Sequence, residues 1–221
     1  MLVTSHSVIA IDGPAASGKS SVARELARRL GFVYVNSGAM YRAVTWYVLN
    51  KHVDLVDSAA IARLVNSAHI VCDLAGNEAR VFIDQENPVE FLRDDRVNRG
   101  VSLVSSVPRV REILVEKMRS YANEHNLVME GRDIGSVVFP KTPYKFYIDA
   151  SPDVRLRRRA AEGQQDEITA RDRADSSRRA SPLIIAPDAH VVDSSNMSIQ
   201  EVVDEIIRQL KAKGVSPDLP A

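Results

Sequence analysis

The chain has 221 residues, of which 45% are hydrophobic and 26% are charged. This balance is typical of a globular protein, and the length predicts one domain with insertions rather than two independent domains. The 29 basic and 29 acidic side chains cancel, which argues against a protein that binds nucleic acid or a membrane surface. Cys72 has no second cysteine to pair with, and no apolar run approaches membrane-spanning length. We therefore expect a cytoplasmic protein, and a monomer.

The chain opens with a strand, a glycine-rich turn, a helix and a second strand. Residues 8–11 form an unalternated apolar run, which is typical of a parallel strand buried on both faces. Apolar residues then recur every three or four positions over 20–30, which predicts an amphipathic helix that Gly31 can end. Residues 32–35 predict the next buried strand. Such a unit places the turn at the carboxyl edge of a parallel sheet, where ligands bind.

The remaining pattern continues this alternation, with one interruption. Gly76 and Asn77 separate two extended runs and predict a hairpin, so we interpret residues 64–101 as an insertion. Ser151 and Pro152 fit the cap and first position of a helix. The other expected elements are strands at 127–129, 144–148 and 191–192, helices at 39–49, 108–122 and 199–213, and a disordered tail at 215–221. The expected fold is α/β, with a central parallel sheet flanked by helices.

The turn after the first strand matches the phosphate-binding pattern Gly-x4-Gly-Lys-Ser at every position. Its glycines allow backbone N–H groups to face phosphates, and the following helix adds its positive end. Lys19 is expected to bridge the β- and γ-phosphates of ATP, and the Ser20 hydroxyl to bind Mg²⁺. An ordinary glycine turn is disfavoured by the strand and helix on either side. The expected donor site comprises Gly13, Pro14, Ala15, Ala16, Ser17, Gly18, Lys19, Ser20 and Ser21.

This loop defines a class of protein and not an acceptor. A GTPase would normally add Asn-Lys-x-Asp, and the nearest candidate, at 50–53, lacks the aspartate. Guanidinium groups suit a bidentate grip on phosphate, so arginines in polar segments indicate a phosphorylated acceptor. The candidates are Arg42, Arg109, Arg132, Arg171 and Arg178.

Two further segments have alternative interpretations. The basic run at 155–159 is typical of a solvated helix face, with Arg158 a candidate contact to ATP. The polar stretch at 162–166 is either a mobile cover that excludes water from the reacting phosphates or a simple surface loop. We place the candidate lid at about 158–170.

Several motifs together resemble those of the bacterial cytidylate kinases, which belong to the nucleoside monophosphate kinase group. The resemblance runs nearly end to end. Besides the phosphate loop and residues 11–14, it rests on the segments 37–42, 108–111, 131–135, 137–140 and 171–183. It implies a P-loop fold with an inserted acceptor-binding region, which corresponds to 64–101, and phosphorylation of CMP and dCMP by ATP with Mg²⁺.

The resemblance also implies roles for individual residues. Ser102, Arg109 and Asp133 would read the cytosine; Tyr41, Arg171 and Asp175 would lie near the ribose; and Arg42, Arg132 and Arg178 would hold the phosphate. Ser37 would be a further substrate-binding residue. Lys19, Arg132, Arg171 and Arg178 would be catalytic.

This chain departs from the family pattern in three places. The family often has Asp where this chain has Glu130, which leaves the reach of that carboxylate open. The loop ends in Ser20 and Ser21, which keeps the hydroxyl, and the segment 160–168 is shorter than in some members. The alternatives are a kinase for adenylate, shikimate or dephospho-coenzyme A on the same scaffold, and a nucleotide-dependent switch or nucleic-acid-binding NTPase.

Overall fold

A computed structural model of the chain describes residues 6–161, 168–178 and 181–215. Within these residues, seven strands form one sheet in the order β3–β4–β2–β5–β1–β6–β7. All neighbouring strands are parallel except β3 and β4. The strands are β1 (Val8–Asp12), β2 (Val33–Asn36), β3 (Ile70–Ala75), β4 (Glu78–Ile83), β5 (Leu127–Gly131), β6 (Tyr144–Asp149) and β7 (His190–Asp193). The predicted α/β fold with a mostly parallel central sheet is confirmed.

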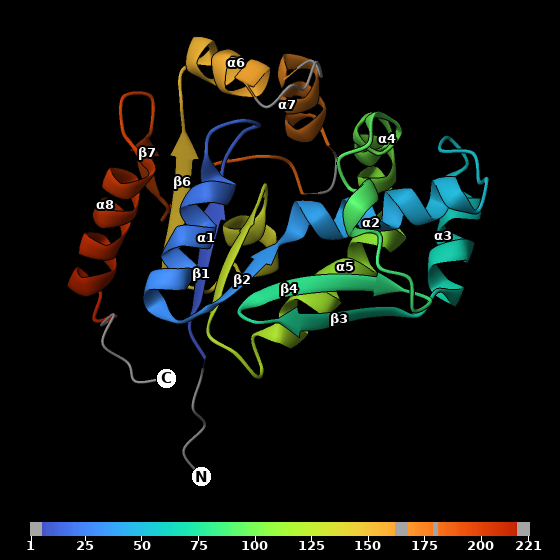
Figure 1. Ribbon diagram of the computed structural model, residues 1–221, viewed down its shortest axis with the longest axis horizontal. Coiled ribbons are helices and arrows are strands. Elements are labelled where there is room, and N and C mark those ends of the chain that lie inside the picture. Colours follow the sequence, from blue (N-terminus) through green and yellow to red (C-terminus); the bar gives the residue numbers. More distant parts are fainter. Residues whose placement is uncertain (1–5, 162–167, 179–180, 216–221) are drawn as a thin grey trace.

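Helices cover both faces of the sheet (Figure 1). They are α1 (Lys19–Leu30), α2 (Ser37–Asn50), α3 (Ser58–Ser67), α4 (Asp95–Ser106), α5 (Pro108–Tyr121), α6 (Pro152–Ala161), α7 (Ile168–Ser176) and α8 (Ile199–Ala212). Alternate residues of β1 face opposite ways: Ile9 and Ile11 pack with α1 and α8, whereas Val8 and Ala10 pack in the cluster built by α2 to α5. The uninterrupted apolar run of β1 is therefore explained by burial on both faces.

The opening unit forms as its sequence predicts. All five residues of β1 are buried, and α1 ends at Gly31 in the left-handed conformation. The second helix begins earlier than expected, at Ser37, because the Asn36 side chain caps it by accepting a hydrogen bond from the Ala39 N–H at 2.9 Å. The turn between β1 and α1 thus lies at the carboxyl edge of the sheet.

The hairpin at β3 and β4 is antiparallel, as predicted, and Gly76 takes the positive φ of its turn. It extends the central sheet, because β4 pairs with β2 in parallel at Tyr34 and Glu78. The stretch 64–101 thus contains the end of α3, the hairpin, the short 3₁₀ turn η1 (Val89–Phe91) and the start of α4. One further element, the five-residue π-helical turn η2 (Ile134–Val138), follows β5.

Helices α6 and α7 lie beyond the carboxyl ends of β1 and β6 (Figure 1). They flank residues 162–167 of the expected lid, which lie outside the described residues, as does the tail at 216–221. No helix in the described part of the chain is long and apolar enough to cross a membrane.

Candidate active site

The phosphate loop, residues 13–20, has the backbone geometry that phosphate binding requires. Gly13 has φ +156°, and a Cβ there would lie 2.2 Å from the Ile148 carbonyl oxygen, so no larger residue fits. Gly18 is left-handed, with φ +87°, and leads directly into α1. The ammonium of Lys19 is buried in the loop and donates to the Pro14 carbonyl at 2.8 Å. Loop N–H groups and the helix N-terminus together form a site for an anion.

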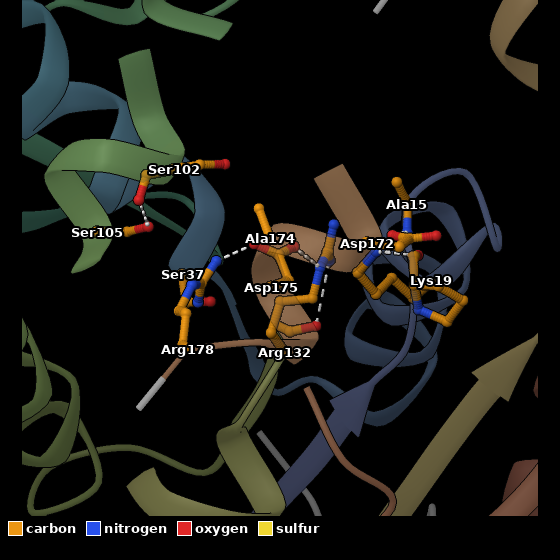
Figure 2. A network of polar contacts seen from close by, with 12 residues as sticks. Ala15, Lys19, Ser37, Ser102, Ser105, Arg132, Asp172, Ala174, Asp175 and Arg178 are labelled. Atoms are coloured by element: carbon orange, nitrogen blue, oxygen red, sulfur yellow. Dashed lines mark hydrogen bonds and ion pairs between the residues drawn. The ribbon is translucent and has the colours of Figure 1, made fainter. Parts of the chain in front are cut away.

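An anionic oxygen from α7 already lies on this loop. The Asp172 carboxylate accepts a hydrogen bond from the Ala15 N–H at 2.9 Å (Figure 2). Arg155 of α6 donates to Asp172 and to the Ala15 carbonyl, the latter at 3.2 Å. Helices α6 and α7 are thereby tied to the loop, and one of the loop N–H groups binds a carboxylate oxygen.

Arg158 joins the loop to the segment after β7. Its guanidinium donates to the Ser17 carbonyl at 3.2 Å and to the Ser194 carbonyl at 2.7 Å. Ser194 in turn donates to the Ser17 carbonyl at 2.9 Å. Arg158 therefore lies at the donor loop and not on a solvated helix face.

Glu130 lies at the end of β5, next to β1, and is buried. Its Oε1 accepts a hydrogen bond from the Ser20 hydroxyl at 2.8 Å. The longer side chain of glutamate thus reaches the hydroxyl expected to bind Mg²⁺. Carboxylate and hydroxyl oxygens, completed by phosphate oxygens, are the ligands that Mg²⁺ prefers.

One cavity of about 580 Å³ opens beside the loop and continues toward α4 and the hairpin. Most of the residues predicted from the sequence line it. They are Ala15, Ala16, Gly18, Lys19, Ser20 and Ser21 from the donor site, and Ser37, Tyr41, Arg42, Ser102, Arg132, Asp133, Asp175 and Arg178 from the acceptor site. Four predicted donor residues do not line it: Gly13, Pro14, Ser17 and Arg158. The side chain of Arg171 lies outside the described ones. Donor and acceptor residues thus share one space.

Two arginines of the acceptor set meet on one carboxylate. Arg132, after β5, donates to Asp175 at 2.8 Å, and Arg178 donates to the other oxygen of the same carboxylate (Figure 2). Asp175 is buried, and burial lowers the pKa of Arg178 in spite of this partner. The resemblance implies a place near the ribose for Asp175; in the structure its carboxylate binds both guanidinium groups at the cavity.

Asp133 is the second buried carboxylate of the acceptor site, and its partner is Arg111. Burial raises the pKa of Asp133, while the nearby guanidinium groups of Arg111 and Arg178 lower it. The Arg111 guanidinium also lies over the Tyr41 ring, 5.3 Å from its centroid. Both side chains of the pair are buried, and Asp133 lines the cavity.

Arg109, which the sequence assigns to the base, does not reach the cavity. It donates to Asn66 at 2.7 Å and to Glu112 at 3.0 Å, with 48% of its side chain exposed. Residues two apart on a helix point in opposite directions, so Arg109 and Arg111 cannot both face the site. Arg111 shares the buried face of α5 with Leu114 and Met118, three and seven positions later, a spacing that was available from the sequence.

The other acceptor residues come from two helices. Ser37 donates to the Glu130 carbonyl at 2.8 Å, and Arg42 approaches Asn98 of α4 at 3.4 Å. Tyr41 is buried, which raises its pKa to about 12, and its hydroxyl has no hydrogen-bond partner among the described residues. Ser102 lies on α4, a helix that the sequence does not predict. These side chains form the wall opposite the phosphate loop.

The chain is similar to known proteins over nearly its whole length. A model of the cytidylate kinase family matches residues 9–212. The cytidylate kinase of Pelotomaculum thermopropionicum is 47% identical over 217 residues, covering 92% of this chain and 96% of its own length. That of Mycolicibacterium paratuberculosis is 43% identical over 222 residues, covering 94% and 97%. A solved structure of a gluconokinase from Sinorhizobium meliloti shares the fold, with a TM-score of 0.50 and 13% identity over 95% of this chain and 93% of its own.

Proposed function

The chain belongs to the cytidylate kinase family, and we propose that it catalyses ATP + CMP → ADP + CDP and accepts dCMP as well. The observation that carries this proposal is the shared cavity. Lys19 of the donor loop and the arginines of the acceptor site line the same space, so two bound nucleotides can meet there without a protein wall between them. Such a reaction supplies pyrimidine nucleoside diphosphates.

Phosphoryl transfer requires alignment and charge stabilisation more than covalent chemistry. The loop N–H groups and Lys19 would bind the donor phosphates, and Arg132 and Arg178 would hold the acceptor phosphate in line with the γ-phosphorus. The acceptor phosphate is already anionic at neutral pH, so no general base is needed. Arg42 and Arg171 complete the proposed set around the acceptor.

The residues present fit a Mg²⁺ ion. The Ser20 hydroxyl and the Glu130 carboxylate lie 2.8 Å apart at the loop and would hold it together with donor phosphate oxygens. When bound, Mg²⁺ neutralises part of the phosphate charge.

The base specificity is proposed to rest on Asp133. Cytosine has an amino donor at C4 beside acceptors at N3 and O2, whereas uracil has a carbonyl in place of the amino group. A carboxylate held by Arg111 can accept from that amino group, and against uracil it would face a second acceptor. Ser102 is proposed as a further polar contact.

Two regions are proposed to move or close around the substrates. Residues 64–101, with the hairpin and the start of α4, would bind the acceptor, because residues of β4 within this segment line the cavity and Ser102 directly follows the segment. Residues 158–170 would act as a short lid, because α6 and α7 already contact the phosphate loop through Arg155 and Asp172.

A coupled assay of ADP formation across AMP, CMP, dCMP, GMP and UMP tests the proposal. CMP is expected to be the best ribonucleotide acceptor. If AMP or GMP were preferred, the acceptor assignment would be wrong while the kinase assignment stood. If no monophosphate were phosphorylated and ATP hydrolysis instead required a protein or nucleic acid, the switch alternative would replace it.

A further inference from the structure

Asp12 lies at the junction of the donor and acceptor sites, and neither assignment uses it. It is the last residue of β1, directly before Gly13 of the phosphate loop, and is only 5% exposed. One carboxylate oxygen accepts a hydrogen bond from the Ile134 N–H and the other from the Gly135 N–H, each at 2.8 Å. These two residues open the turn η2, and the two residues before them are Arg132 and Asp133. A single side chain therefore joins the root of the donor loop to the turn directly after two acceptor residues.

The surroundings leave this contact little freedom. Asp12 is held in the sheet by pairing with Gly131 of β5 and Tyr147 of β6. On the other side, a Cβ at Gly135 would lie 3.4 Å from the Asp12 carboxylate and 3.2 Å from the stem of Lys145. Gly135 of η2 thus lies between Asp12 and a buried lysine, with little space for a larger side chain.

The chemistry of the contact requires a carboxylate. Two neighbouring N–H groups need two acceptor oxygens side by side, which an aspartate supplies. An asparagine has the same shape, but its NH₂ group would face one of the two N–H donors and leave it unsatisfied. Burial raises the pKa of Asp12 to about 7 even though both N–H groups lower it, because burial of a carboxylate costs free energy. An apolar residue at this position would avoid that cost.

We propose that Asp12 is a positioning residue for the acceptor site, which fixes the turn directly after Arg132 and Asp133, and thereby these two residues, relative to the phosphate loop. The inference rests on the proposed function in taking these two residues as acceptor groups. In-line transfer depends on the distance between the donor phosphates and the acceptor phosphate. Asp12 directly precedes the donor loop and binds the turn after the acceptor residues, so it fixes the backbone at both ends of that distance.

The same turn offers a matched control at its other end. Arg119 of α5 donates to the Val138 carbonyl at 2.9 Å and to the Val137 carbonyl at 3.0 Å. It fastens the end of η2 that is remote from Arg132 and Asp133. Loss of Arg119 is expected to lower the stability of the turn without moving the acceptor groups.

The experiment compares Asp12→Asn with Arg119→Met in three measurements: amide hydrogen exchange, steady-state kinetics with CMP and UMP, and ATP affinity by titration. For Asp12→Asn we expect faster exchange at the Ile134 and Gly135 amides, because one of them loses its acceptor. The KM for CMP should rise at least about tenfold and the ratio of kcat/KM for CMP to that for UMP should narrow, because the acceptor residues are no longer held in place, while the affinity for ATP stays unchanged. Arg119→Met should lower the melting temperature and leave all kinetic constants near wild type.

Each remaining outcome decides the matter. A folded Asp12→Asn protein with a wild-type KM for CMP would overturn the proposal, as would an equal effect of Arg119→Met on the KM for CMP. If Asp12→Asn does not fold, Gly135→Ala provides the test, because its Cβ would crowd the Lys145 stem at 3.2 Å and contact the Asp12 carboxylate at 3.4 Å while Asp12 stays in place, and a wild-type KM for CMP in this variant would then overturn the proposal. A wild-type enzyme that prefers another nucleotide would overturn the proposed function alone, since amide exchange and the KM for the preferred acceptor would still test Asp12.

Discussion

At the scale of single residues, Lys19 carries the clearest expectation. Its ammonium is held inside the phosphate loop by the Pro14 carbonyl, where it would meet the transferring phosphoryl group. Lys19→Ala is expected to leave a folded protein and to lower kcat by a factor on the order of 10³, since one charge clamp in phosphoryl transfer is worth several kcal/mol. Turnover measured beside a thermal melt checks this. Lys211→Ala, an exposed lysine of α8, is the control, and unchanged turnover in Lys19→Ala would contradict the donor-site assignment.

Asp133 should control the choice between CMP and UMP. We expect wild-type kcat/KM for CMP to exceed that for UMP by at least about tenfold, because a buried acceptor facing a second acceptor is costly. Asp133→Ala should narrow this gap by lowering kcat/KM for CMP more than kcat/KM for UMP. Assays of both nucleotides at a temperature where the variant is folded measure the change.

The partner of Asp133 offers a paired test. Arg111→Met removes the cation that holds the carboxylate and should reduce the preference for CMP, together with a loss of stability from the unpaired buried charge. Arg109→Ala, two positions earlier and exposed, should change neither. A selectivity loss in Arg109→Ala with none in Arg111→Met would restore the assignment made from the sequence.

Asp12 also predicts a pH dependence of stability. Its pKa rises from 3.8 to about 7 on folding, chiefly by burial and to a lesser degree by Asp133, against the lowering effect of the two N–H groups and Arg132. A raised carboxyl pKa means that the folded state holds the proton more tightly, so this contribution is fully present below the unfolded pKa and is lost as pH rises through the folded one. The free energy of unfolding of wild type, less that of Asp12→Asn, should therefore fall between about pH 4 and about pH 7. Denaturant titrations of both proteins measure it, and a difference that stays flat or rises would contradict the pKa.

At the scale of elements, the proposed acceptor phosphate site lies where the residue after β5 meets the end of α7. Arg132 follows β5, Arg178 follows α7, and the Asp175 carboxylate holds both. Arg132→Ala and Arg178→Ala are each expected to weaken CMP binding more than ATP binding, because these side chains lie on the acceptor side. Titration of each variant with each nucleotide separates the two effects. Equal weakening of CMP binding and ATP binding would contradict the division of the cavity into a donor side and an acceptor side.

Local signals decide which elements the sequence predicts. The unit of β1, the phosphate loop and α1 is predictable because apolar run, glycines and helical period agree over neighbouring residues. Helix α4 is not, since its buried residues Val97, Val101 and Val104 are β-branched and favour strands, and its packing against α2 and α5 stabilises it instead. The turn η2 is hydrogen-bonded to Asp12, more than a hundred positions away, so no local sequence pattern predicts it.

The same distinction applies to the site. The donor residues were predictable as a contiguous motif, and the carboxyl ends of β1 and β5 bring Ser20 and Glu130 together through strand pairing. Arg111 shares the helical spacing of Leu114 and Met118, so its inward position could have been predicted from the sequence, whereas Arg109 was assigned only through the family resemblance. The joint grip of Asp175 on two arginines depends on tertiary packing.

At the scale of the whole molecule, the sheet separates two hydrophobic clusters, and the site lies at the carboxyl edge of the sheet between them. One cluster joins α1 and α8 to β1 and β6, and the other joins α2 to α5 to the opposite face. The donor loop is rooted in the first and most of the acceptor wall in the second, with Asp12 and Glu130 at the boundary. The chain carries no net charge, so attraction of two anionic nucleotides must come from the arginines and Lys19 concentrated at this boundary.

This arrangement predicts the response to a compound that joins both substrates. If ATP and CMP occupy one continuous cavity, adenosine and cytidine linked through their 5′ positions by a polyphosphate should bind far more tightly than either nucleotide, because the second half binds at a high effective concentration. Binding to the folded state raises the melting temperature, so the mixed compound should raise it more than ATP and CMP added together at equal concentration. Diadenosine polyphosphate of the same length is the control and should stabilise less, since its second base cannot satisfy Asp133. Stabilisation by the mixed compound no greater than by ATP alone would show that the donor and acceptor sites do not open onto each other.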